Sequence, residues 1–449
     1  MAGNNTYSQL SSDVEAFIAD ETLPLARRQL VAYQFGDPLT LDKGRGLTYT
    51  ATRYNRLPLP FAPLSEGVGP AQGQSMTLNQ VSATAQQWGD KVVITDVAEM
   101  TIKHPLFKKA TELVALQMSE TLERNTFNSL MAGTQVNYVN SRGSRAALTT
   151  TDYLDPTTVI RTNAALETLG APRFMGDEDT DMKKDVDAGG GRASDNPRAM
   201  PHYSAIIHTL AVGDFRQVSS VITAWSYSDL NRLYNYEVGE WSGIRFCKSN
   251  LVPTFTGVAQ INGSAATTGA LATGTYYVQV TASDTQNQYE SRIYQVSAGV
   301  SVTGPTGSVT VVLPALPGFT FNVYIGTTTS PQNLGLCAVG PTSGPLAGQA
   351  VQLAPGQTVT ITGLGTAQVP PAAPATGVTV FPTFIIGRGA YGQVVLDDAK
   401  FSYLTGPDKS DPLSQLRVIG WKLMYGTLIE NQAFFARIES ASAFTATFG

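Results

Sequence analysis

One stretch of this 449-residue chain differs sharply in composition from the rest. Between Phe255 and Val380 the only charged residues are Asp284, Glu290 and Arg292, whereas charged residues make up 14% of the whole chain. Short β-branched runs alternate there with turn residues, which is the pattern of a β-sandwich. Residues of ordinary composition stand on both sides. We therefore interpret residues 255–380 as an all-β domain inserted into a loop of a host fold, an arrangement that proteins tolerate well.

The strands expected in this insert are short and β-branched. They are Thr275–Thr281, Tyr294–Val302, Ser308–Leu313, Phe319–Ile325, Leu334–Val339, Val351–Leu353 and Thr358–Ile361. The proline-rich residues Pro370–Pro374 follow them and are interpreted as a linker back to the host.

The host fold begins with two dissimilar segments. Residues Tyr7–Phe35 have helical spacing, and Gly36 and Pro38 are expected to end that helix. Leu47–Tyr54 and Met76–Thr95 are then predicted as two long strands of one hairpin around a Pro- and Gly-rich loop. A two-stranded hairpin is marginally stable alone. We therefore expect this hairpin to lie on another molecule.

The strongest local prediction is a long helix from Pro105 to about Gly133. Phe107, Ala110, Val114, Met118 and Leu122 recur there at three- to four-residue spacing. At 1.5 Å per residue the helix would be roughly 40 Å long, which suits a spine bracing a wide, thin subunit.

The rest of the host has mixed character. We expect helices at Pro156–Leu169 and Ser228–Tyr236, an exposed loop at Gly176–Asn196, and strands at Tyr203–Val212, Phe381–Ile386, Val394–Leu396, Leu416–Met424 and Arg437–Glu439.

Charge and cysteine content restrict the class of protein. A net charge of −5 argues against a surface that grips nucleic acid, because phosphate binding needs clustered Lys and Arg. Cys247 and Cys337 stand far apart without a CxxC motif, so two reduced thiols are expected. The polar N-terminus predicts no signal peptide, and no apolar run is long enough for a membrane helix. We expect synthesis in a cytoplasm.

Three patterns resemble chemical motifs, and each has a simpler structural explanation. Gly387–Val394 matches the GxGxxGxV phosphate loop of kinases, but the further kinase motifs are missing, so turn glycines between two strands are expected. His202 and His208 have even spacing without a third metal ligand. A solvated loop is expected for the acidic run, which does not fit a calcium loop: Asp177, Glu178, Asp179, Asp181, Asp185 and Asp187. We therefore expect no enzyme and no catalytic, cofactor-binding or metal-binding residues.

The order of these segments resembles the Hong Kong 97-type capsid fold of tailed bacteriophages, and more specifically the major capsid family named after the podophage N4. The resemblance covers about Tyr7–Val252 and Phe381–Glu439. It depends on Gln80–Gly89, Ile94–Glu99, His104-Pro105, Thr121–Glu123, Met131–Thr134 and Gly420–Lys422. Within the insert, Thr275–Ala282 and Phe321–Gly326 resemble strands of phage immunoglobulin-like or fibronectin-like domains.

The resemblance implies an α+β fold with an inserted all-β Ig-like sandwich. The implied parts are an N-terminal arm (1–43), an E-loop hairpin (44–96), a peripheral domain with the spine helix (97–200), a first axial part (201–254), the insert (255–380) and an axial and peripheral return (381–449).

The same resemblance implies a structural function. Such chains form the pentamers and hexamers of an icosahedral head that encloses double-stranded DNA without reading its sequence. A separate scaffolding protein, a portal and a decoration protein are the expected partners, no membrane is involved, and the location is the virion. Two alternatives stay open: an encapsulin-like compartment shell, and a surface adhesin that uses the Ig-like domain.

Overall fold

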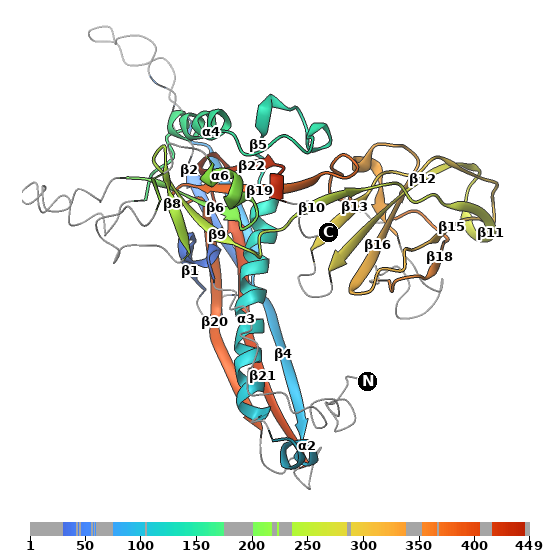
Figure 1. Cartoon of the computed structure of the whole chain (residues 1–449), viewed down its shortest axis with the longest axis horizontal. Helices are drawn as coiled ribbons and strands as arrows, with labels where there is room; N and C mark the ends of the chain where they lie inside the picture. The colour runs from blue at the N-terminus through green and yellow to red at the C-terminus, as the bar shows by residue number, and fades with distance from the viewer. Residues whose placement is uncertain are drawn as a thin grey trace, which may run out of the picture. The chain divides into compact units, whose positions relative to one another are not determined.

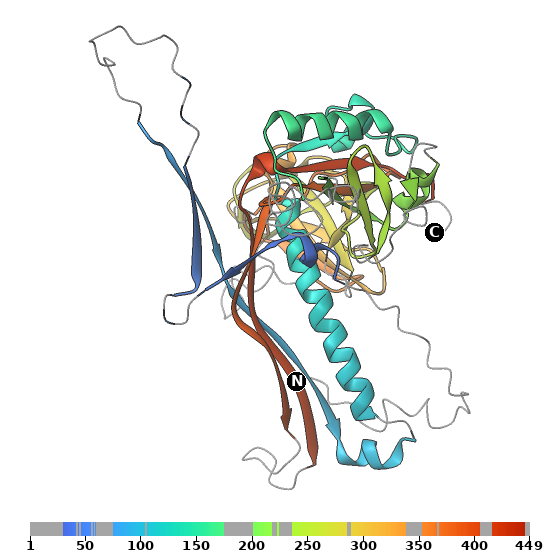
Figure 2. The ribbon, with the colours of Figure 1, turned by 90° about the vertical axis from the view of Figure 1, so that its left-hand side faces the viewer.

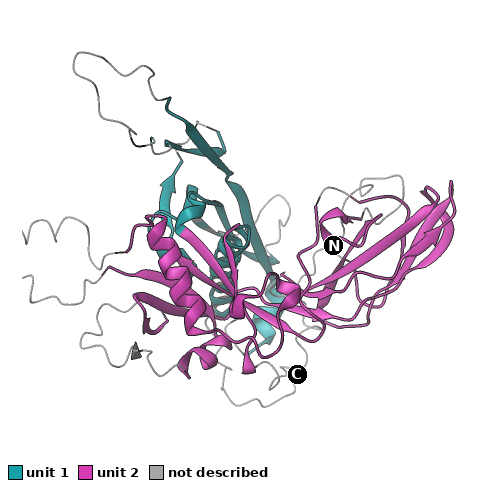
Figure 3. Ribbon diagram, turned by 90° about the horizontal axis from the view of Figure 1, so that it is seen from above, with its two compact units in different colours: residues 1–133, 388–434 teal, residues 134–387, 435–449 magenta. Residues whose placement is uncertain are grey.

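The structure is a computed structural model that describes residues 30–41, 44, 46–54, 57, 59, 75–103, 106–174, 201–217, 222–223, 236–284, 289–337, 353–365, 368–404 and 415–444. The chain divides into two compact units, coloured separately in Figure 3: unit 1 holds residues 1–133 and 388–434, and unit 2 holds residues 134–387 and 435–449. Each unit is thus assembled from two stretches that lie far apart in the sequence.

Unit 1 is a long helix packed along a sheet of four strands (Figures 1 and 2). The helix is α3 (Leu106–Met131), and the sheet has the order β1 (Asp37–Thr40), β20 (Tyr391–Leu404), β21 (Leu416–Ile429) and β4 (Gln86–Thr95). β1 is parallel to β20, whereas β21 is antiparallel to both of its neighbours. The two C-terminal strands extend well beyond the predicted runs at Val394–Leu396 and Leu416–Met424.

The predicted apolar stripe is the face that α3 buries. Ala110, Val114 and Leu122 lie in one buried cluster with Ile419 and Trp421 of β21, and Met118 packs against the same cluster. The spine helix is thereby confirmed over its described residues, and its 26 residues give roughly the expected 40 Å. Pro105 lies outside the described residues.

The hairpin prediction is right for its first half and wrong for its second. β2 (Thr48–Tyr54) and β3 (Leu78–Thr84) form a separate two-stranded sheet, here called the ribbon, paired from Thr48–Thr84 to Tyr54–Leu78. At Ala85 the chain changes partner, and β4 pairs with β21 instead of with the first arm. The strand propensity of Gln86–Thr95 was visible in the sequence, but its partner stands more than three hundred residues later.

The predicted N-terminal helix is not seen where the structure describes that segment. Residues 7–29 lie outside the described part, Ala32–Phe35 form one 3-10 turn (η2), and Pro38 lies within the short strand β1. The fixed φ of proline suits this position at the edge of the sheet. A short helix, α2 (Asp96–Thr101), connects β4 to α3 and is capped by the Thr95 hydroxyl.

Unit 2 is organised on one continuous sheet. Its host part has the order β19 (Thr379–Ile386), β6 (Tyr203–His208), β9 (Ile244–Ser249) and β8 (Glu237–Trp241), with β22 (Phe435–Ser440) on the other side of β19. The host part also contains α4 (Pro156–Thr168), α6 (Ala211–Arg216), β5 (Val136–Tyr138), β7 (Ile222–Thr223), η3 (Val139–Ser141) and η4 (Arg145–Ala147).

Several boundaries in unit 2 differ from the predictions. The helix over Pro156–Leu169 is confirmed as α4, with Asp155 as its cap. The strand predicted over Tyr203–Val212 ends at His208, because α6 begins at Ala211. Residues 228–235 of the predicted short helix and residues 176–196 of the predicted loop lie outside the described residues.

The insert contains two sheets around one core. One sheet holds β10 (Phe255–Val258), β12 (Gly274–Asp284), β13 (Glu290–Tyr294), β14 (Val300–Val302), β16 (Phe319–Gly326) and β17 (Gly335–Leu336), and the other holds β11 (Ser264–Leu271), β15 (Gly307–Val312) and β18 (Thr358–Ile361). Val278, Val280 and Phe321 of the first sheet and Val309 and Ile361 of the second are buried in the same cluster. This is the layered packing of a β-sandwich.

The strand predictions for the insert succeeded where side chains alternate clearly. β12, β15, β16 and β18 lie at or within one to three residues of their predicted bounds. The run predicted as Tyr294–Val302 is two strands, β13 and β14, and Leu334–Val339 reduces to β17 within the described residues. The polar strand β11 was missed because Ser, Ala, Thr and Gly give it almost no apolar alternation.

The insert is joined to the host sheet by hydrogen bonds as well as by the chain. β10 runs parallel to β13 of the insert and antiparallel to β19 of the host, so the main chain of Thr256 is paired with Arg292 on one side and Thr379 on the other. The predicted linker is also held in place, since Gln295 Nε2 donates to the Pro374 carbonyl. The segment still connects the insert to the host strand β19, and this bond fixes its end.

A buried ion cluster fixes both ends of the insert. Arg145 donates to both carboxylate oxygens of Glu439 on β22, at 2.6 and 2.7 Å, and Arg437 Nε lies 3.0 Å from the same carboxylate. The Arg145 guanidinium also donates to the Ala372 carbonyl and lies 4.2 Å from the ring centre of Phe255. Ala372 precedes β19 and Phe255 begins β10, so one buried cation contacts the chain where it enters and where it leaves the insert.

We predict that Arg145→Ala lowers the free energy of unfolding of unit 2 by about 3 kcal/mol, because it leaves the fully buried carboxylate of Glu439 with half of its partners. Denaturant unfolding monitored by fluorescence would measure the change. The matched control is Arg161→Ala, an exposed arginine bonded to Ser141, which we expect to change stability by less than about 0.5 kcal/mol. Equal effects of the two substitutions would contradict this account of the cluster.

Candidate assembly surface

The ribbon and the described residues next to it carry apolar side chains that the described part of the chain leaves exposed. Tyr54 is 62% exposed, Leu59 is 76% exposed and Met76 is 67% exposed. Leu47, Leu57, Leu78 and Val81 add to the same exposed set. Tyr54 and Leu78 are directly opposite each other on the two strands and so share one face. Large exposed apolar side chains that lie together mark sites of protein–protein contact.

Only the base of the ribbon is anchored. Tyr49, Ala51 and Ala83 pack against a small buried cluster that includes Ala85 and Val394. Arg53 is the only charged residue within β2 and β3. The outer half of the ribbon is thus nearly neutral and partly apolar, and it carries few charges that would have to be desolvated in a contact.

The ribbon is a sheet of only two strands within the described part of the chain. β2 and β3 pair only with each other among the described strands, and Figure 2 shows the ribbon extending away from the four-stranded sheet of its own unit. Exposed strand edges are templates for pairing with another chain. A neighbouring molecule could therefore cover the exposed apolar side chains and extend the two-stranded sheet.

The glycine-rich segment is confirmed as a turn between two strands. It follows β19, which ends at Ile386, and leads into β20, which begins at Tyr391. Gly389 has a φ of +71°, a conformation that favours glycine. A Cβ on Gly392 would come within 2.3 Å of the Leu39 side chain of β1, so this glycine permits close strand packing.

The two histidines considered as metal ligands, His202 and His208, are each packed against an aromatic residue. His202 is buried and bridges to Phe174, whereas His208 packs against the ring of Phe381. Burial lowers the pKa of His208 to about 4, and its Nδ1 accepts from the Leu210 backbone. The structure brings no group of three or more His, Cys, Asp or Glu together within its described part, and the acidic run Asp177–Asp187 lies outside it.

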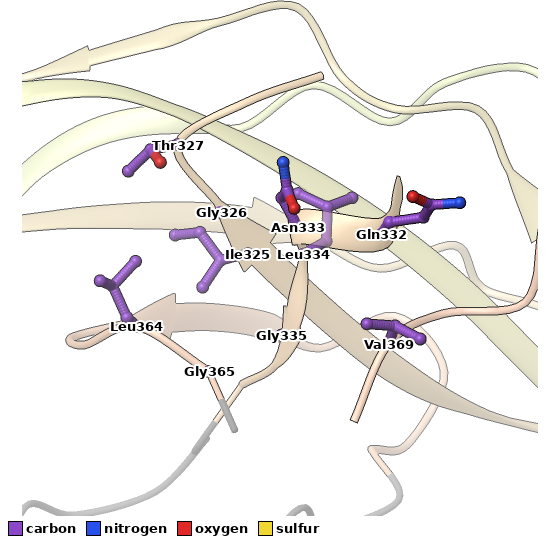
Figure 4. Close-up of a pocket in the computed structure, with 10 residues that line it drawn as sticks. All are labelled: Ile325, Gly326, Thr327, Gln332, Asn333, Leu334, Gly335, Leu364, Gly365 and Val369. Carbon is purple, nitrogen blue, oxygen red and sulfur yellow. The ribbon is translucent and has the colours of Figure 1, made fainter. Parts of the chain in front are cut away.

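The insert has one open pocket, shown in Figure 4, of about 260 Å³. Ile325, Leu334, Leu364 and Val369 supply apolar surface. Thr327, Gln332 and Asn333 supply hydroxyl and amide groups, and glycine main chain completes the lining. None of the ten described residues that line it is ionisable.

Comparison with known proteins finds similarity in structure only. No protein-family model matches the chain, and no curated protein matches it in sequence. A chain from the capsid of Ralstonia phage GP4 matches with a TM-score of 0.50 at 8% identity, over 95% of this chain and 97% of that chain. This chain has a phage capsid fold.

Two further capsid structures are similar at lower scores. The capsid of cyanophage P-SCSP1u matches at a TM-score of 0.47 and 11% identity, over 95% of this chain and 93% of that chain. The head of Helicobacter pylori bacteriophage KHP40 matches at 0.46 and 8%, over 98% of both chains. No helix in the described part is long and apolar enough to cross a membrane.

We predict that neither cysteine reacts in the folded protein. Cys247 and Cys337 are free and buried, and burial raises the pKa of both thiols far above the usual range, so the reactive thiolate is absent at pH 8. Iodoacetamide followed by intact mass measurement should add no label to the native chain and two labels after denaturation. Labelling of the native chain at a rate typical of free thiols would contradict the buried placement.

Proposed function

We propose that this chain is the major capsid protein of a tailed bacteriophage and forms the pentamers and hexamers of an icosahedral head around double-stranded DNA. The fold shared with the phage GP4 capsid chain supports the proposal, and the ribbon carries it, because its exposed apolar side chains are the kind of surface that protein–protein contacts bury. The chain acts as structural material in the virion, with no catalytic residues.

We assign the parts of the Hong Kong 97-type, N4-like architecture on the same basis. The ribbon belongs to the E-loop (44–96), whose last strand, β4, continues into the four-stranded sheet of unit 1. The helix α3 is the spine helix of the peripheral domain (97–200), and the sheet around β6 and β19 belongs to the axial domain that begins at 201–254. Residues 381–449 return to both domains, since β20 and β21 lie in unit 1 and β22 lies in unit 2. The sandwich at 255–380 is the Ig-like domain and lies on the shell exterior.

The proposed partners follow from that role. A net charge of −5 fits a shell that encloses DNA without gripping it, since tight phosphate contact needs clustered cations. A scaffolding protein, a portal and a decoration protein would complete the head. An encapsulin-like compartment is the closest competing proposal, and genes for a portal and a terminase beside this one would exclude it.

A second function is proposed for the insert alone, which is attachment to a cell surface. The pocket in Figure 4 supports it, because its lining combines apolar side chains with amide and hydroxyl groups, which fits an uncharged ligand such as a neutral sugar. In a phage, this binding would add to shell formation. In an adhesin, it would replace shell formation.

We predict that Val81→Lys abolishes shells and leaves the subunit folded. The new charge would have to be buried in the contact between subunits, at a cost of about 3 kcal/mol or more for each copy of the contact. Negative-stain electron microscopy of the chain expressed with its neighbouring genes measures assembly, and circular dichroism checks the fold. The control is Val312→Lys, on an exposed valine of the insert, which we expect to leave shells intact. Normal shells from both variants would refute the assembly role of the ribbon.

We predict that the insert is dispensable for assembly. Residues 260–373 should be replaced by a short Gly-Ser connection, which keeps the pairing of β10 with β19 and the close contact of Gly257 with Pro374 and Ala375. Shells of normal size should form, and their binding to host cells should fall. Loss of shells from this variant would instead make the insert a structural part of the capsid.

A further inference from the structure

Glu123 of α3 is a fully buried carboxyl group that binds the arm turn, defined here as residues Val31–Phe35. Its Oε1 accepts from the backbone N–H of Ala32 at 2.7 Å and of Val31 at 2.9 Å. Its Oε2 is buried and has no hydrogen-bond partner. The side chain of Glu123 on α3 thus binds a segment that lies about ninety residues earlier in the chain.

The opposite side of the arm turn is held from the strands. Tyr391 donates its hydroxyl to the Ala32 carbonyl, and Gln393 Nε2 donates to the Tyr33 carbonyl at 2.9 Å. Both residues belong to β20, while Glu123 belongs to α3. The arm turn is therefore bound between helix and sheet by side chains that contact its main chain, a form of binding that does not depend on the sequence of the turn.

Among the described residues, no cation shifts the pKa of Glu123, and Arg388 acts on the neighbouring carboxyl group of Asp37. The titratable groups that face this site are Tyr391 of β20, Tyr425 of β21, Tyr33 of the arm turn and Asp37 of β1. Glu430, which follows β21, interacts with Asp37 and adds a further carboxyl group. Desolvation therefore outweighs the backbone hydrogen bonds and raises the pKa of Glu123 to about 7.

We propose that Glu123 is a proton-controlled latch: the arm turn is held firmly when this carboxyl group is neutral and is released more readily when it ionises. Release would expose Glu123 to water and return it to ordinary carboxyl behaviour. The held state then binds more protons than the released state between pH 4.5 and about 7. The free energy that holds the arm turn is therefore largest at the acid end of that interval. It decreases as the pH rises through the interval and stays constant above it.

Hydrogen exchange of the full-length chain tests the latch independently of shell formation. The protection of residues 30–41, corrected for the intrinsic exchange rate and referenced to β21, should fall by up to about tenfold for each pH unit between pH 5 and 7. In Glu123→Gln, which keeps an acceptor oxygen without a titratable proton, this dependence should disappear. In Glu99→Gln, a partly exposed carboxylate paired with Arg417, the dependence should stay as in the natural chain.

A third variant keeps the test decisive if Glu123→Gln does not fold. Tyr391→Phe removes the hydroxyl bonded to Ala32 and leaves Glu123 in place, so protection should fall by a similar factor at every pH while its pH dependence is unchanged. Unchanged pH dependence in Glu123→Gln, or a flat profile in the natural chain, would overturn the latch. Loss of the dependence in Tyr391→Phe would also overturn it, because the titrating group would then be elsewhere.

Discussion

Unit 1 depends on the packing of one face of α3 against β21 and β4. The strands are long and the sheet is narrow, so no second helix or sheet shares the work of burying their apolar side chains in the described structure. Val114 and Leu122 come from one part of the chain, and Ile419 and Tyr425 come from another three hundred residues later. Unit 1 can therefore fold only when both of its stretches, residues 1–133 and 388–434, are present. Because these contacts join residues far apart in the sequence, we expect the unit to fold slowly.

The narrow sheet of unit 1 also explains why apolar side chains of the ribbon stay exposed. A compact domain would fold the ribbon back onto its own core, but here only Tyr49, Ala51 and Ala83 at its base reach a buried cluster. Two strands alone cannot supply the missing hydrophobic burial. In the proposed shell, each subunit would cover apolar surface of its neighbour, so stability would be distributed over the assembly.

Much of this architecture is visible in the sequence because it is local. The helical stripe from Ala110 to Leu122 and the alternating strands of the insert follow from side-chain periodicity alone. The partner change at Ala85 could not be predicted, since β4 looks the same whether it pairs with β2 or with β21. Arg145 and Glu123 resemble ordinary surface charges of a loop and a helix, and only tertiary packing makes them buried anchors. The charges of the insert follow the same rule: Glu290 accepts from Thr281, Asn322 and Tyr324 inside the sandwich.

The continuity of the sheet through β10 has a mechanical consequence. A domain on a flexible tether transmits tension through two chain ends and can swing freely under load. Here a pull on the insert acts on the row of main-chain hydrogen bonds between β10 and β19, and on the salt bridge from Arg145 to Glu439 behind them. A force that pulls on the sandwich would thus act directly on the paired strands β10 and β19 inside unit 2.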